Sequence, residues 1–86
     1  MTSGALTTSG NALVIGAFEV HTASVESQTI TIGGVAADAT DYGLVNNFQP
    51  TAGWRLITGA QSGVSSTLTR TTSTILVAQT IAFRAA

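Results

Sequence analysis

Residues 11–22 read Asn-Ala-Leu-Val-Ile-Gly-Ala-Phe-Glu-Val-His-Thr. Side chains alternate between the two faces of an extended chain, so this pattern predicts a β-strand that is apolar on both faces in its first half. One face carries Val14, Phe18 and Val20, and the other carries Leu13, Ile15 and Ala17. Glu19 and His21 make the second face polar towards the end, where we expect it to meet water or a polar seam.

Three further stretches predict strands. Residues 28–34 alternate Ile30 and Ile32 with threonine and stop at two glycines, which is typical of a half-buried strand. Residues 54–58 place Trp54 and Leu56 on one face and end in a turn at residues 59–63. Residues 64–70 alternate Val64, Ser66 and Leu68 with Ser65, Thr67 and Thr69, which indicates an exposed strand with a thin apolar edge.

The run Thr74–Arg84, Thr-Ile-Leu-Val-Ala-Gln-Thr-Ile-Ala-Phe-Arg, is the most apolar in the chain. As a strand it has Ile75, Val77, Ile81 and Phe83 on one face and Leu76, Ala78 and Ala82 on the other. A helix is the competing interpretation. Frequent β-branched residues and the lack of a good cap favour the strand.

The remaining segments complete an all-β prediction. Residues 1–10 are rich in Thr, Ser and Gly, which favours an extended N-terminal arm that orders against a neighbour. Residues 35–53 read as a long connection with one short strand or turn of helix near residues 42–47. We therefore expect a single domain at residues 11–86, a small antiparallel β-sandwich of jelly-roll type with five to seven short strands.

Composition narrows the class of protein. Only 8% of the 86 residues are charged, with three arginines, four acidic residues and no lysine, whereas soluble domains have about 25%. This scarcity of positive charge argues against nucleic-acid and membrane partners. There is no cysteine for a disulfide or thiolate metal site, and no apolar run approaches the roughly 20 residues of a membrane span. The first residues lack the features of a signal peptide, so we expect no Sec export.

Catalytic and metal-binding candidates are weak. His21 is the one histidine, and no serine lies in a nucleophile-elbow sequence, so a catalytic triad is not expected. Glu19 and His21 share a strand face but lack further metal ligands. Asp38 and Asp41 flank a loop that could hold calcium, although aspartates in loops more often form turns. We predict neither an enzyme nor a cofactor.

The surplus of apolar residues on the first and last strands predicts an oligomer, because one thin sandwich cannot bury both faces. An edge strand at 75–83 without Lys or Pro would also template pairing. The interface candidates are Leu6, Leu13, Ile15, Arg55, Leu76, Ala78 and Arg84. Tyr42 and Trp54 are candidates for contact with a glycan or a partner, although core packing is the default expectation for Trp54 and for Phe48.

Three segments, residues 9–20, 52–59 and 73–85, resemble the opening, middle and closing strands of small jelly-roll modules in tailed-phage virion proteins. Such modules occur in capsid decoration (cement) proteins, head fibres and tail-fibre tips. The resemblance implies a virion structural role without an enzymatic site, in a homo-oligomer that is often a trimer. The expected partners are further copies of the chain and a major capsid protein or another virion protein. The expected location is the virion, which is assembled in the host cytoplasm. A receptor- or glycan-binding fibre tip and a self-assembling surface filament or adhesin remain as alternatives.

Overall fold

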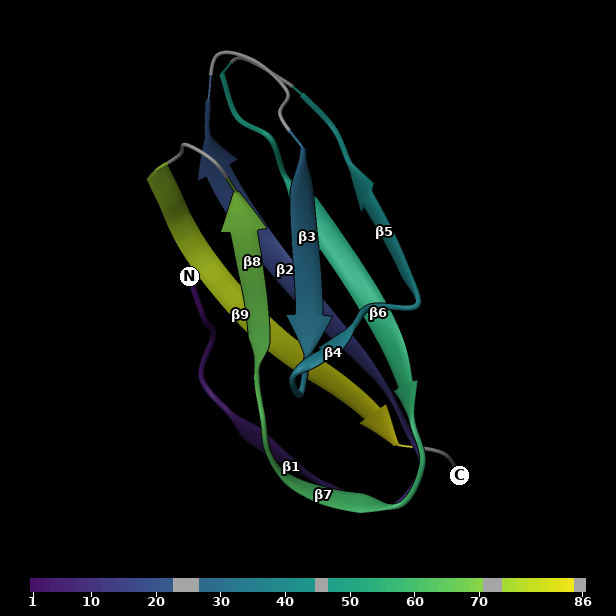
Figure 1. Ribbon diagram of the computed structural model, residues 1–86. Coiled ribbons are helices and arrows are strands. Elements are labelled where there is room, and N and C mark those ends of the chain that lie inside the picture. Colours follow the sequence, from purple (N-terminus) through teal and green to yellow (C-terminus); the bar gives the residue numbers. More distant parts are fainter. Residues whose placement is uncertain (23–26, 45–46, 71–73, 85–86) are drawn as a thin grey trace.

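The computed structural model describes residues 1–22, 27–44, 47–70 and 74–84, with side chains in the last segment from residue 77 onwards. Within these ranges the chain is all-β, with nine strands, no helix and no closed barrel (Figure 1). The strands are β1 (Leu6–Ser9), β2 (Ala12–His21), β3 (Gln28–Ile32), β4 (Val35–Ala36), β5 (Ala39–Tyr42), β6 (Thr51–Ile57), β7 (Ala60–Val64), β8 (Ser66–Arg70) and β9 (Thr74–Arg84). The strand prediction for Thr74–Arg84 is thus confirmed over the helix.

The larger sheet has the order β5-β6-β2-β9, and all of its pairs are antiparallel. Strand β2 lies in the middle and pairs with β6 from Ala12↔Ile57 to Phe18↔Thr51. On its other side β2 pairs with β9 along the full length of both strands, with one register shift after Glu19. Strand β9 therefore lies at an edge of the sheet, in agreement with the edge strand expected at residues 75–83.

A three-stranded sheet, β4-β3-β8, covers one face of the larger sheet (Figure 1). The core lies between the two sheets, because the strict alternation of β2 places every second side chain inward. Its buried apolar members are Ala12, Val14, Phe18, Val20, Ile30, Ile32, Ile57, Val64 and Leu68. The predicted shared face of Val14, Phe18 and Val20 and that of Ile30 and Ile32 are confirmed, and both faces are buried.

The N-terminal segment pairs with its own chain. Strand β1 pairs with β7 in a two-stranded sheet at one end of the molecule (Figure 1). Before it, the Ser3 N–H donates to the Ser66 carbonyl at 2.9 Å, and the Leu68 N–H donates to the Met1 carbonyl at 3.0 Å. Residues 1–3 therefore line the edge of β8, and the arm orders without a neighbouring molecule.

Local sequence explains the tight connection between β3 and β4. Gly33 and Gly34 adopt φ values of 61° and 79°, which a two-residue hairpin turn of this type requires and which glycine adopts without steric cost. The predicted stop at these glycines is confirmed.

Three sequence predictions were wrong. The stretch 35–53 contains β4, β5 and the start of β6 rather than a long connection, and residues 59–63 contain most of β7. The predicted single strand at 64–70 is broken at Ser65, where the chain passes from β7 to β8. Its inner side is buried rather than exposed: Val64, Ser66 and Leu68 are at most 1% accessible. Because the chain changes sheets through such short steps, nine strands form where five to seven were expected.

Candidate interaction surface

The outer face of the four-stranded sheet, turned away from the core, is covered by no other part of the described chain. Residues opposite each other in antiparallel strands share a face, so the register assigns its side chains to rows across β6, β2 and β9. The upper row holds Leu56, Leu13 and Phe83; the middle row holds Trp54, Ile15 and Ile81; the lower row holds Ala52, Ala17 and Gln79. On β5, Ala39 extends the middle row and Asp41 extends the lower one.

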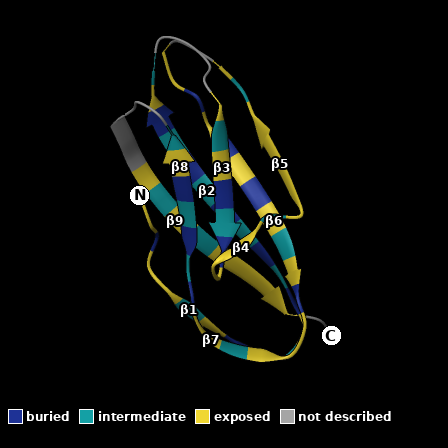
Figure 2. Cartoon of the chain, viewed as in Figure 1, coloured by how far each residue is buried: buried dark blue, intermediate teal, exposed yellow. Residues whose placement is uncertain are grey.

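All six side chains of the upper and middle rows are large and apolar, and we call them the apolar patch. Leu56 is 63% exposed, Phe83 57%, Ile81 44% and Trp54 41%, while Leu13 and Ile15 between them are half-buried. Figure 2 shows this exposure along the C-terminal half of β9 and on β6. A chain of 86 residues that leaves six large apolar side chains side by side presents a surface typical of protein interfaces.

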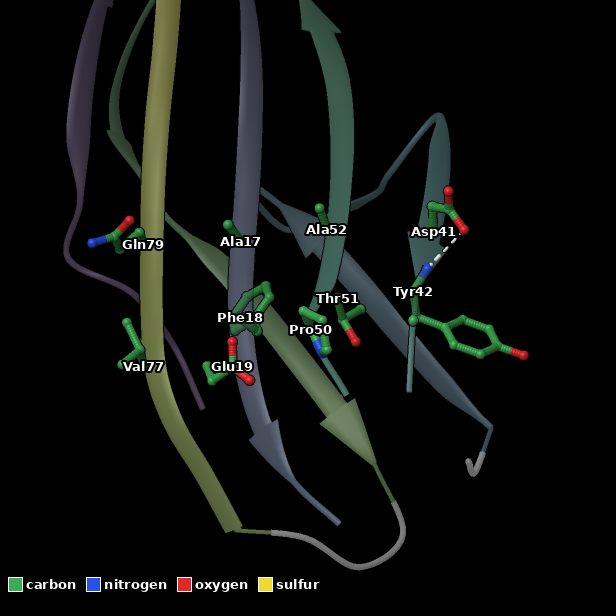
Figure 3. A pocket seen from close by; sticks show the side chains of 11 residues that line it. Ala17, Phe18, Glu19, Asp41, Tyr42, Pro50, Thr51, Ala52, Val77 and Gln79 are labelled. Carbon is green, nitrogen blue, oxygen red and sulfur yellow. Dashed lines mark hydrogen bonds between the residues drawn. The ribbon is translucent and has the colours of Figure 1, made fainter. Parts of the chain in front are cut away.

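The lower row forms a hollow, because Ala17 and Ala52 are short. Figure 3 shows the side chains that line the hollow, whose volume is about 540 Å³. Gln79 and Val77 of β9 bound it on one side, and Asp41 and Tyr42 of β5 on the other, with Glu19 and Pro50 at its end. The Tyr42 N–H donates to Asp41 Oδ1 at 2.8 Å, and the 54% exposed Tyr42 ring lies at the rim. The outer face therefore changes from bulky and apolar to hollow and partly acidic along the strands.

The interface candidates separate into two groups. Leu13 and Ile15 lie in the apolar patch, together with Trp54, and Tyr42 lies at the rim of the hollow. Leu6 and Ala78 are partly buried and pack against the core, so core packing already occupies much of their surface. The side chain of Leu76 lies outside the described residues.

The two arginine candidates also differ. Arg55 lies on the inward side of β6, and its Nη1 donates to the Ile32 carbonyl at 2.8 Å, which ties the two layers together. Arg84 is exposed at the end of β9, and its Nη1 lies 3.5 Å from Ser9 Oγ. The guanidinium of Arg84 is thus the more accessible to a partner.

The default expectation of core packing for Trp54 and Phe48 was wrong, since the two residues are 41% and 39% exposed. Phe48 instead contacts His21, with ring centroids 5.4 Å apart. Leu56, Ile81 and Phe83 were not among the sequence candidates, although alternation had put each on a common strand face with another apolar residue. Their assembly into one patch depends on the pairing of β6 and β9 with β2, which the sequence pattern does not encode directly.

The polar candidates form local hydrogen bonds. Asp38 Oδ2 accepts from the Leu56 N–H at 2.9 Å, and Asp41 accepts from Tyr42 as described, so both carboxylates hold backbone groups near β5. Within the described residues, no three His, Asp or Glu side chains gather as a metal site would require. The same residues contain no helix long and apolar enough to cross a membrane.

Comparison of the chain with protein-family models, with curated proteins and with solved structures gave no match.

Proposed function

We propose that this chain is a non-enzymatic virion structural protein, a capsid decoration protein that binds as an oligomer and stabilises a phage capsid. The observation that carries the proposal is the apolar patch of six large side chains on an outer sheet face. Burial of apolar surface contributes about 25 cal/mol per Å² before ordering costs are subtracted. Such a face favours permanent assembly over a freely dispersed monomer.

The strand pairing supports the proposed jelly-roll sandwich. Strands β2 and β3 pair antiparallel with β9 and β8, so the chain folds back on itself as a long doubled hairpin across two layers. Jelly rolls are built by this kind of wrapping. The three segments that resemble phage modules correspond to β2, β6 and β9, which are neighbours in one sheet.

The low charge also supports a role within an assembly. With three arginines and four acidic residues, the chain has few charges to keep separate copies apart. A low charge favours contact between the subunits of a shell, because few charged side chains then have to be removed from water when the subunits meet.

Particle composition tests the virion role. Particles would be induced from a host that carries the coding sequence, banded by density and analysed by quantitative mass spectrometry. We expect the chain in the particle band at a stoichiometry fixed relative to the major capsid protein, and released before the capsid when particles are heated. A chain that stays in the lysate supernatant, with the capsid protein in the band, would contradict the proposal.

A glycan-binding fibre tip is the second candidate, and the hollow favours it. Tyr42 at the rim and Trp54 in the adjoining row offer ring faces, while Asp41, Glu19 and Gln79 offer hydrogen-bonding groups. A glycan array with the purified chain separates the two functions: a hit that Tyr42→Ala and Trp54→Ala abolish, and Phe48→Ala does not, would establish the fibre-tip role. An array without hits would leave the decoration role.

A further inference from the structure

We propose that a second copy of this chain packs face to face on the outer sheet face, in an isologous dimer whose two-fold axis runs along the middle row Trp54–Ile15–Ile81. In this arrangement the upper row of each copy fills the hollow of the other. The inference rests on the self-association in the proposed function, and is independent of attachment to a virion.

The spacing of the rows leads to this arrangement. The upper and lower rows each lie two residues from the middle row, about 7 Å along the strands on either side. A two-fold axis in the interface, perpendicular to the strands, therefore places the upper row of one copy over the lower row of the other. Each strand then crosses its own counterpart, so that Leu56 faces the partner's Ala52 and Leu13 faces the partner's Ala17.

The shapes of the two rows are complementary. Leu56 is the most exposed member of the apolar patch, and with Leu13 it would enter the hollow of about 540 Å³ that Ala52 and Ala17 leave open, while Phe83 would meet the partner's Gln79. Packed sheets lie about 10 Å apart, and a large side chain opposite a small one fills this distance without leaving a void. The alternative axis, parallel to the strands, would set the upper rows against each other and leave both hollows empty.

The charges select the same arrangement. Glu19 and Asp41 lie at the lower end of the outer face, whereas Arg84, which pairs with the buried Ala12, lies on the inward side of β9. Rotation about the middle row places the acidic end of each copy away from the acidic end of the other. Rotation about an axis parallel to the strands would instead bring the acidic ends together, which is unfavourable in a partly dry interface.

The area suffices for a specific dimer of moderate affinity. The four exposed members of the apolar patch are 41–63% exposed, and together with Leu13, Ile15 and the lower row they provide about 500 to 700 Å² of accessible surface per copy. Two copies would bury about 1,000 to 1,400 Å², which lies at the lower end of specific interfaces. A second copy is therefore a sufficient partner for this face.

Exchange of the large residue at position 56 and the small residue at position 52 tests whether these two positions face each other across the dimer interface. Ala52→Leu fills the hollow and Leu56→Ala removes the side chain that enters it; both positions are exposed, so the fold tolerates each change. Each single variant is expected to weaken dimerisation, measured by sedimentation equilibrium, at least about tenfold. The double variant Ala52→Leu with Leu56→Ala restores a large residue opposite a small one and is expected to recover most of the affinity.

Ala52→Leu distinguishes this packing from non-specific apolar association, because it adds apolar surface and would then strengthen self-association. Val35→Ala, an equally apolar truncation of a 49% exposed residue on β4, serves as the control and should leave the dimer unchanged. Circular dichroism verifies that each variant is folded. A native monomer at all concentrations, a trimer, or a double variant no better than the single ones would overturn the proposal. A dimer that is absent from particles would leave it standing and remove only the virion role.

Discussion

Gly16 shows how a single residue sets the distance between the two layers. It lies on the inward face of β2, and a Cβ at this position would lie 2.6 Å from both Cβ and Oγ of Ser66 on β8. Ser66 is fully buried and accepts a hydrogen bond from Thr80 Oγ1 at 2.8 Å, so it has no free space into which to move. The close approach of β2 and β8 therefore requires glycine here.

Gly16→Ala is expected to lower the free energy of unfolding by about 1–3 kcal/mol, as overpacking of a core does. Urea unfolding followed by circular dichroism measures the loss. Gly10→Ala is the matched control, since a Cβ at Gly10 meets nothing within 4 Å and φ there is ordinary. Equal stability of the two variants would show that the layers separate more easily than this packing implies.

Arg55 was an interface candidate from the sequence, yet its hydrogen bond to the Ile32 carbonyl assigns it a role within the fold. Arg55→Met keeps an aliphatic stem and removes this charge-assisted bond, so we expect a loss of about 1.5–3 kcal/mol in unfolding free energy. Arg84→Met, the same change at an exposed position, should cost little stability. An Arg55→Met variant of native stability that self-associates more weakly would restore the interface role.

At the scale of elements, the N-terminal segment acts as an edge cover. Residues 1–3 line β8 through the Ser3–Ser66 and Met1–Leu68 backbone bonds, and Ser3 also contacts the Thr80 hydroxyl. The Ser66 N–H donates to Ser3 Oγ at 3.0 Å, so a truncated chain would leave this buried group without its acceptor. Such an uncovered edge is a template for pairing with other chains.

Deletion of residues 1–5 is therefore expected to reduce the unfolding free energy by about 2–4 kcal/mol, since several hydrogen bonds of about 1 kcal/mol each are lost. Thermal and urea unfolding of the truncated and full chains provide the comparison, with Thr2→Val as a control that removes only the exposed Thr2–Thr67 side-chain bond. Truncation without loss of stability would indicate an arm that is available to a neighbour. It would then favour the sequence-based expectation of an arm that orders against a neighbour.

Strands in which apolar and polar residues alternate strongly were predicted from the sequence. Strands that form only because another strand offers a partner were not. Residues 12–21 and 28–32 alternate cleanly, and the residues that share the buried face of each strand were grouped correctly. Strands β4, β5 and β7 are short and mostly exposed, so little in their own residues distinguishes them from loops. They form because β3, β6 and β1 offer partners, which is information about the fold as a whole.

The candidate surface was predictable to the same extent. Leu13 and Ile15 were identified because β2 is apolar on both faces, and an excess of apolar surface followed directly. Leu56 and Phe83 were not, because their place beside Leu13 depends on the register of two strands remote in sequence. The hollow likewise arises from Ala17 and Ala52 meeting across β2 and β6, and no local pattern marks two alanines as neighbours.

At the scale of the whole molecule, an apolar outer face makes stability depend on concentration. A partner that binds only the folded chain contributes about 2.7 kcal/mol at a hundredfold excess over its Kd. In a domain of this size each kcal/mol shifts the Tm by about 4–8 °C. The Tm of the native chain should therefore rise by about 10 °C or more when protein concentration increases from well below the Kd to a hundredfold above it.

Leu56→Glu provides the decisive comparison in calorimetry across this concentration range. The position is 63% exposed, so a carboxylate is tolerated in the monomer but must lose its water in the dimer. We expect a Tm for this variant that equals that of the dilute native chain and does not change with concentration. Val35→Glu introduces the same charge on β4, away from the outer face, and should keep the native slope. If the native Tm were flat, the apolar patch would be stable in water, and self-association could not be the reason for its composition.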